Sequence, residues 1–173
     1  LSYEKPARHT REYLSVLKPL VTIGTVDFAG DDYQVSAQLS VPGGSPFPVL
    51  VSALAPVMLR VAGELADGTI TWMSGQRTIA SHIAPRINRA ADLAGKPSPR
   101  ICVGLPIAVT DDKKAAFNQA SKIFKNYGHL PNYRRMLDIE QVTSPADVAI
   151  IGNEAEVGEQ LRSFKNSGAT DFL

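Results

Sequence analysis

The stretch from Val49 to Met73 reads VLVSALAPVMLRVAGELADGTITWM and decides the fold. Its first five residues form a short apolar run of the kind found in buried strands. Pro56 suits the first position of a helix, which we expect to end near Ala66 with Gly68 terminating its last turn. Thr69 to Met73 alternate β-branched and aromatic side chains, as strands do. A buried strand, a helix and a second strand in this order predict a parallel βα unit.

The same pattern continues after Met73. A predicted helix carries Ile79, Ile83 and Ile87 on one face and stops before two prolines. The run from Ile101 to Val109 predicts one further apolar strand, and Asp111 and Asp112 then open another helix. These elements add a second and a third βα unit to the chain.

The last predicted helix begins at Asn153, which with Glu156 resembles a capping box, and ends at Gly168. Residues 169–173 then start a fourth strand. Four parallel strands with helices between them fit either a small doubly wound sheet or half of a (β/α)8 barrel, which typically needs about 250 residues. The pattern by itself leaves both architectures open.

The residues before Val49 follow a different pattern. A helix is predicted over residues 7–17, and VDFAGDDYQV, residues 26–35, reads as a hairpin around an Ala-Gly-Asp-Asp turn. VPGGSPFP, residues 41–48, is a linker rather than a phosphate loop, because no buried strand precedes it and no helix follows it. We expect a single domain over residues 1–173, with helix, hairpin and linker in 1–48 and the βα units in 49–173.

Composition excludes several classes of function. The chain has 18 Lys and Arg residues against 17 Asp and Glu residues, a balance that indicates neither nucleic acid nor an anionic membrane as a partner. No apolar run reaches the roughly 20 residues of a membrane span, and the first residues lack a signal peptide, so a cytoplasmic protein is expected. The chain begins with Leu1 and stops at Leu173 as a strand begins, which suggests part of a longer gene product.

Metal and disulfide chemistry are not expected. Cys102 is the single cysteine and lies in an apolar run, where it behaves as a small buried hydrophobe. The three histidines, His9, His82 and His129, form no H-x-x-x-H pair, and we assign His9 and His82 to helix surfaces or edges.

The candidate site is the turn SALAP, which contains Ser52, Ala53, Leu54 and Ala55. Small residues at the carboxyl end of a parallel strand let a ligand approach the backbone, and the free N–H groups of the next helix attract an anion such as phosphate. The alternative is that small residues simply pack best in a tight turn. Ser52 is not expected to be a nucleophile, because VSALA is not a G-x-S-x-G motif.

Two further groups of residues are candidates. Trp72 and Met73 end the second strand, where an indole can pack on a ring-shaped ligand or simply belong to the core. The later segment offers aromatic and cationic side chains that could contact an anionic substrate or cofactor tail: Tyr127, His129, Tyr133, Arg134 and Arg135. A solvated helix face or a subunit contact would explain them equally well.

Several segments together resemble one family. MLRVAGELADG, followed by a strand ending in Trp, resembles the luciferase-like flavin and deazaflavin oxidoreductases, in which a helix ending in Ala-Asp-Gly follows the fifth barrel strand. GLPIAVTDD, YGHLPNYRRMLD and IGNEAEVGEQLRSFKNSGATDFL are similar to the seventh strand, the insertion and the last helix and strand of the coenzyme F420-dependent branch. REYLSVLKPL and the VDFAGDDYQV hairpin match the helix and excursion before the fifth strand.

The resemblance implies that the chain holds strands five to eight of a (β/α)8 barrel of the bacterial luciferase-like type, with a preceding helix and hairpin. In that family the residues that hold the flavin-like ring come mainly from the first four strands, so it assigns no catalytic residue here. It does assign the phosphate-bearing end of the cofactor to Ser52–Ala55 and the next strand end to Trp72, Met73 and Ser74. Many members have glycines where this chain has Leu54 and Ala55.

The implied activity is hydride transfer between reduced deazaflavin coenzyme F420 and a small organic substrate. The alternatives are an FMN-dependent monooxygenase of the same superfamily, or a non-catalytic half-barrel that binds an anionic ligand. Arg134 and Arg135 are the expected partners of the polyglutamate tail of coenzyme F420. An exposed barrel edge also predicts a homodimer.

Overall fold

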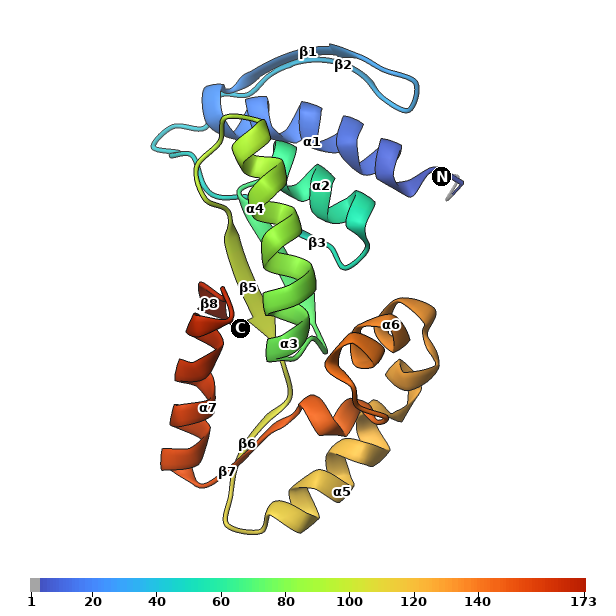
Figure 1. Ribbon diagram of the computed structural model, residues 1–173. Coiled ribbons are helices and arrows are strands. Elements are labelled where there is room, and N and C mark those ends of the chain that lie inside the picture. The colour runs from blue at the N-terminus through green and yellow to red at the C-terminus, as the bar shows by residue number, and fades with distance from the viewer. Residues whose placement is uncertain (1–3) are drawn as a thin grey trace.

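The computed structural model describes residues 4–173 and begins with a helix and a hairpin (Figure 1). The helix α1 (Pro6–Ile23) runs further than predicted, because it continues through Pro19 and stops only at Gly24, whose φ of 77° is left-handed. Strands β1 (Thr25–Ala29) and β2 (Gln34–Gln38) form the predicted antiparallel hairpin. None of the helices within residues 4–173 is both long and apolar enough to cross a membrane.

The fold-deciding stretch forms β3 (Leu50–Ser52), α2 (Pro56–Leu65) and β4 (Gly68–Trp72), as predicted. Gly68 does not terminate the helix but opens β4, where a Cβ atom would lie 2.1 Å from the carbonyl oxygen of Arg100. The glycine is therefore required by the close approach of β5 rather than by the helix end.

The second unit contains an irregular helix. The short α3 (Gln76–Thr78) passes into one turn of π-helix, η1 (Ile79–Ile83), and then into α4 (Ala84–Leu93). The predicted apolar face is confirmed, since Ile79, Ile83 and Ile87 are all fully buried. The strand β5 (Arg100–Gly104) follows.

The predicted strand over residues 101–109 is wrong as a single element. β5 ends at Gly104, and β6 (Ile107–Val109) leaves the sheet to pair in parallel with β7 (Ile150–Gly152), a strand that we did not predict. The break falls at Pro106, which has no N–H to donate to a neighbouring strand, while its carbonyl oxygen accepts from the N–H of Ile150.

Between β6 and β7 lies an insertion of short helices, followed by the last helix and strand. These elements are α5 (Lys113–Phe124), η2 (Lys125–His129), α6 (Pro131–Glu140), η3 (Pro145–Val148), α7 (Glu154–Asn166) and β8 (Asp171–Phe172). The capping box of Asn153 and Glu156 is confirmed, since both of its hydrogen bonds are present.

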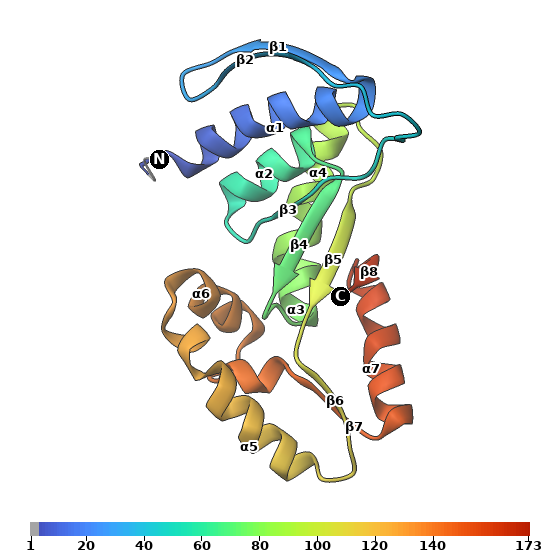
Figure 2. The same ribbon diagram turned by 180° about the vertical axis from the view of Figure 1, so that it is seen from behind.

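The sheet order distinguishes the two architectures that the sequence left open. The four strands lie in the order β3-β4-β5-β8 and every neighbouring pair is parallel. A doubly wound sheet reverses its strand order and carries helices on both faces. Here the order never reverses, and α2 and α4 lie on one face, in front of the sheet in Figure 1 and behind it in Figure 2. The chain therefore forms an arc of a (β/α)8 barrel.

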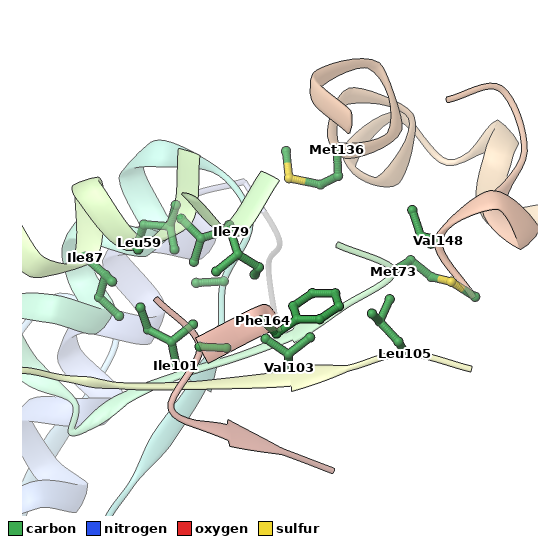
Figure 3. Packing of buried hydrophobic residues seen from close by; sticks show 14 of the residues in the cluster. Leu59, Met73, Ile79, Ile87, Ile101, Val103, Leu105, Met136, Val148 and Phe164 are labelled. Carbon is green, nitrogen blue, oxygen red and sulfur yellow. The ribbon is translucent and has the colours of Figure 1, made fainter. Parts of the chain in front are cut away.

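The main core lies between the sheet and its helices (Figure 3). Ile101 and Val103 of β5 pack with Leu59, Ile87 and Phe164 of the covering helices. A smaller cluster, which includes Leu14 and Val61, joins the hydrophobic face of α1 to that of α2. Since side chains alternate along a strand, the residues between the core positions face the other side of the sheet.

That other face is the inner wall of the arc. Leu50, Ile70 and Trp72 belong to it and are half-buried. Phe172 of β8 contacts Phe164 of α7, with ring centroids 5.2 Å apart, and therefore belongs to the helix side. The carboxyl ends of β4 and β5 point toward the insertion (Figure 2).

Candidate functional site

The turn between β3 and α2 occupies the carboxyl edge of the sheet. Ser52 ends β3 with an exposed side chain, whereas Ala53 is buried in the main core. Leu54 and Ala55 are half-buried and carry the chain into the helix. The turn thus presents mainly backbone to its surroundings.

The N-terminus of α2 has unsatisfied donors. No side chain of the described chain caps it, and its first backbone bond runs from the N–H of Leu59 to the carbonyl oxygen of Ala55 at 2.9 Å. The N–H groups of Val57 and Met58 precede that bond and have no partner in the helix, while Pro56 has no N–H. This end of the helix can therefore accept an anion.

The N-terminus of α3, one strand further along, is already occupied. The carboxylate of Glu140 accepts hydrogen bonds from the N–H of Arg77 at 3.2 Å and from the N–H and hydroxyl of Thr78, both at 2.8 Å. Gly75 permits this contact, since a Cβ atom there would lie 2.4 Å from the carboxyl carbon of Glu140. The protein thus supplies its own anion at α3 and leaves α2 open.

His82 holds the turn in place. Its side chain projects from the π-helical turn, is only 8% exposed and places Nε2 2.7 Å from the carbonyl oxygen of Leu54. Because a carbonyl can only accept, Nε2 carries the hydrogen of this bond. Burial lowers the pKa of His82, and the nearby charge of Arg86 lowers it further against the opposing effect of the bond to Leu54.

We assigned His82 to a helix surface from the sequence, and that prediction is wrong. The available signal was its spacing of three residues from the buried Ile79, which places both side chains on the same side of a helix. The π-helical turn was not visible in the sequence pattern.

A pocket of about 370 Å³ joins the turn to the insertion. Leu54, Ala55 and His82 line one side, and residues of α6, including Arg135 and Asp138, line the other. The structure therefore brings together the predicted turn and Arg135, which lie far apart in sequence. Arg135 is exposed and has no hydrogen-bond or ion-pair partner among residues 4–173.

Arg134 has a different environment from its neighbour. Its guanidinium group donates to Asp138 Oδ1 at 2.8 Å, to the carbonyl oxygen of Thr143 at 2.8 Å and to that of Val142 at 2.6 Å. The bond to Asp138 lies within α6, and the two bonds to carbonyl oxygens fasten the helix to the following loop. Of the two arginines, Arg135 is thus the one whose donors remain available.

Aromatic side chains gather at the end of β4. The rings of Trp72 and Phe124 are 6.1 Å apart, those of Trp72 and Tyr127 are 6.2 Å apart, and Tyr127 contacts Tyr133 at 4.8 Å. The indole lies close over Gly104, and its Nε1 is buried without a hydrogen-bond partner in the described chain. Edge-to-face contacts of this kind fix the orientation of each ring.

The remaining candidates lie apart from the pocket lining. Met73 and Ser74 are fully buried, and Met73 has a φ of 54°. His129 is exposed in η2. Within residues 4–173, no three side chains of metal-binding type lie close enough together to hold an ion.

Comparison with known proteins identifies relatives of two activities. A family model described as luciferase-like monooxygenase matches residues 1–171. An F420-dependent glucose-6-phosphate dehydrogenase from Gordonia bronchialis is 25% identical over 187 residues, which cover 94% of this chain and 52% of that protein. A 5,10-methylenetetrahydromethanopterin reductase from Methanopyrus kandleri is 29% identical over 111 residues, which cover 62% of this chain and 32% of the relative.

Solved structures share the fold. The coenzyme F420-dependent tetrahydromethanopterin reductase from Methanopyrus kandleri superimposes with a TM-score of 0.72 at 18% identity, over 96% of this chain and 56% of that one. An EDTA monooxygenase from a Chelativorans species gives a TM-score of 0.73 at 13% identity, over 99% of this chain and 55% of the other. The chain therefore spans about half the length of the proteins that it matches most completely.

Proposed function

The chain belongs to the luciferase-like monooxygenase family, and we propose that it binds coenzyme F420 as part of an oxidoreductase that transfers hydride to or from a small organic substrate. The relatives named as F420-dependent dehydrogenases and pterin reductases support the choice of cofactor. A cytoplasmic location stays a prediction of the sequence.

One observation carries the proposal: the open N-terminus of α2 and the free guanidinium of Arg135 flank the same pocket. The N–H groups of Val57 and Met58 fit the phosphate of the cofactor, because they are donors without acceptors in the described chain. His82 keeps the backbone of Leu54 in place beside them.

When bound, coenzyme F420 supplies the hydride chemistry, and the protein contributes binding and orientation. In this chain, we assign the phosphate end to the backbone at Leu54–Met58 and the tail contact to Arg135. Trp72 forms a rigid wall at the next strand end, which suits a planar ligand. The reacting proton is not assigned to any residue of this chain.

Two other functions remain as candidates. An FMN-dependent monooxygenase would use the same phosphate site, and the fold is shared with an EDTA monooxygenase. A non-catalytic half-barrel would bind an anion at α2 without turnover. Cofactor preference separates the FMN-dependent monooxygenase from our proposal. A chain that binds inorganic phosphate but neither coenzyme F420 nor FMN would favour the non-catalytic half-barrel.

The test is fluorescence titration of Arg135→Gln with coenzyme F420 and, separately, with FMN. Because an exposed cation contributes up to about 1 kcal/mol, the affinity for coenzyme F420 should fall by about two- to fivefold. The affinity for FMN, which lacks the anionic tail, should change less. Arg162→Gln on α7, outside the pocket lining, is the matched control. Equal losses for both cofactors would contradict the F420 assignment.

A further inference from the structure

A second pocket lies beside the first on the outer surface of the barrel arc. It has a volume of about 310 Å³ and runs between α2 and α4. Pro56 lines both pockets, so they meet at the N-terminus of α2. Three arginines are among the residues that line the second pocket: Arg60, Arg86 and Arg89. We call it the arginine groove.

The positive charge of the arginine groove is largely uncompensated. Its one carboxylate, Glu64, is held by Arg11 and lies 3.8 Å from the Nε of Arg60. Arg86 donates to the carbonyl oxygens of Ser81 and His82, which carry no net charge. Arg89 has no hydrogen-bond or ion-pair partner among residues 4–173.

The groove also offers apolar surface. Val57 is 50% exposed and Leu93 is 80% exposed, and both line it. Arg86 and Arg89 are three residues apart on α4, which spaces them by about 4.5 Å along the helix axis. A flexible chain that carries several carboxylates on short methylene stems would match this pattern of charge and apolar contact.

We propose that the arginine groove binds the oligoglutamate tail of coenzyme F420. The inference rests on the proposed function, since the tail must enter from the phosphate end at α2. From there it passes Pro56 and Val57 and places its carboxylates against Arg60 and Arg86, then against Arg89. Arg135 lines the pocket between the turn and α6, on the other side of Pro56, and would contact the tail where it leaves the phosphate.

An acidic segment of a partner protein and a nucleic acid are the competing occupants. The groove favours the cofactor tail because it opens from the turn assigned to the cofactor phosphate. The chain as a whole carries a formal charge of only +1, so its positive potential is local rather than spread over a surface suited to nucleic acid.

The experiment compares two forms of the cofactor in equilibrium titrations of the 173-residue chain. One form carries a tail of about five glutamates and the other carries none. The double variant Arg60→Gln and Arg89→Gln should lose about five- to tenfold in affinity for the long-tailed form and keep its affinity for the tail-free form. Added salt should reduce the long-tail advantage of the unmodified chain. Arg162→Gln serves as the control, and unchanged urea midpoints establish that all variants fold.

Equal affinities of the unmodified chain for both forms, or equal losses for both in the double variant, would overturn the inference while leaving the cofactor assignment standing. Free oligo-γ-glutamate provides the complementary arm. If it binds the groove but no form of coenzyme F420 binds, the proposed function fails and the oligocarboxylate site remains. Tighter binding of a single-stranded oligonucleotide or of an acidic α-peptide than of oligo-γ-glutamate would assign the groove to another occupant and overturn the inference.

Discussion

His82 connects the irregular helix to the candidate site. Its bond to the carbonyl oxygen of Leu54 spans 28 positions in the sequence and lies in a nearly buried setting. π-helical turns often occur at functional sites, and this one directs an imidazole at the turn that we assign to the cofactor phosphate.

His82→Leu should destabilise the protein by about 1–3 kcal/mol, because it leaves the carbonyl of Leu54 without its donor. His82→Gln can retain a donor and should cost less. The free energy of unfolding in urea at pH 8 measures both. Equal stability of His82→Leu and the unmodified chain would contradict a role for this bond.

The same residue gives a pH dependence. Since burial lowers the pKa of His82 in the folded state, the unfolded chain binds more protons below the ordinary histidine pKa of about 6.5. The contribution of neutral His82 to the free energy of unfolding should therefore be fully present above that pH. It should be lost as the pH falls through the lowered pKa of the folded state. The urea-unfolding free energy of His82→Gln should vary less between about pH 8 and about pH 5 than that of the unmodified chain. An identical slope in both proteins would show that another group is responsible.

Arg134 and Arg135 show what a residue pattern leaves undecided. They are adjacent and identical in type, so the sequence predicted both as tail contacts. Adjacent helical positions point about 100° apart, and only the loop that follows α6 gives Arg134 its carbonyl acceptors. That contact depends on tertiary structure, so sequence alone does not distinguish Arg135 from Arg134.

At the scale of elements, Glu140 anchors α6 on the start of α3. Its carboxylate satisfies donors that the short helix cannot satisfy itself. This contact positions the insertion, and with it Arg135, over the turn after β3.

Glu140→Ala should therefore free the insertion from the sheet. Loss of the carboxylate leaves the N–H groups of Arg77 and Thr78 without acceptors and should cost about 1–3 kcal/mol. Hydrogen exchange measured by mass spectrometry should speed up in both α3 and α6. Asp138→Ala, which removes an exposed carboxylate from the same helix, is the control and should have little effect. Faster exchange only in the residues next to position 140 would contradict the role of Glu140 as an anchor between α6 and α3.

Most helices were predictable because each has a local signal. Pro56 starts α2, the Asn153 capping box starts α7, and the isoleucines of η1 and α4 repeat at helical spacing. The strand β7 is as short as β3, but it follows almost directly on the short helix η3, so its few apolar residues did not stand out as a separate strand. The length of β5 was overestimated because the residues on both sides of Pro106 are equally apolar.

At the scale of the whole molecule, strand order was the feature that local pattern could not supply. Parallel pairing joins residues far apart in the chain, so a doubly wound sheet and a barrel arc give the same alternation of strands and helices. The resemblance to a family favoured the barrel, and the order β3-β4-β5-β8 established it.

The open arc supports our proposal of a homodimer. Within residues 4–173, β3 and β8 each pair with a strand on one side only, and the inner wall leaves Leu50 and Ile70 half-buried. Sedimentation equilibrium should give twice the 18.6 kDa mass of one chain. Leu50→Lys should dissociate the dimer, whereas Ile23→Lys, at an exposed position outside the sheet, should not. A monomer at every concentration would contradict the proposal.

The most direct test of the cofactor assignment is a pair of equilibrium titrations of the unmodified chain, one with coenzyme F420 and one with FMN. We predict saturable binding of coenzyme F420 that inorganic phosphate competes away, with weaker binding of FMN. Binding of FMN as tight as that of coenzyme F420, or no saturable binding of coenzyme F420, would contradict the assignment.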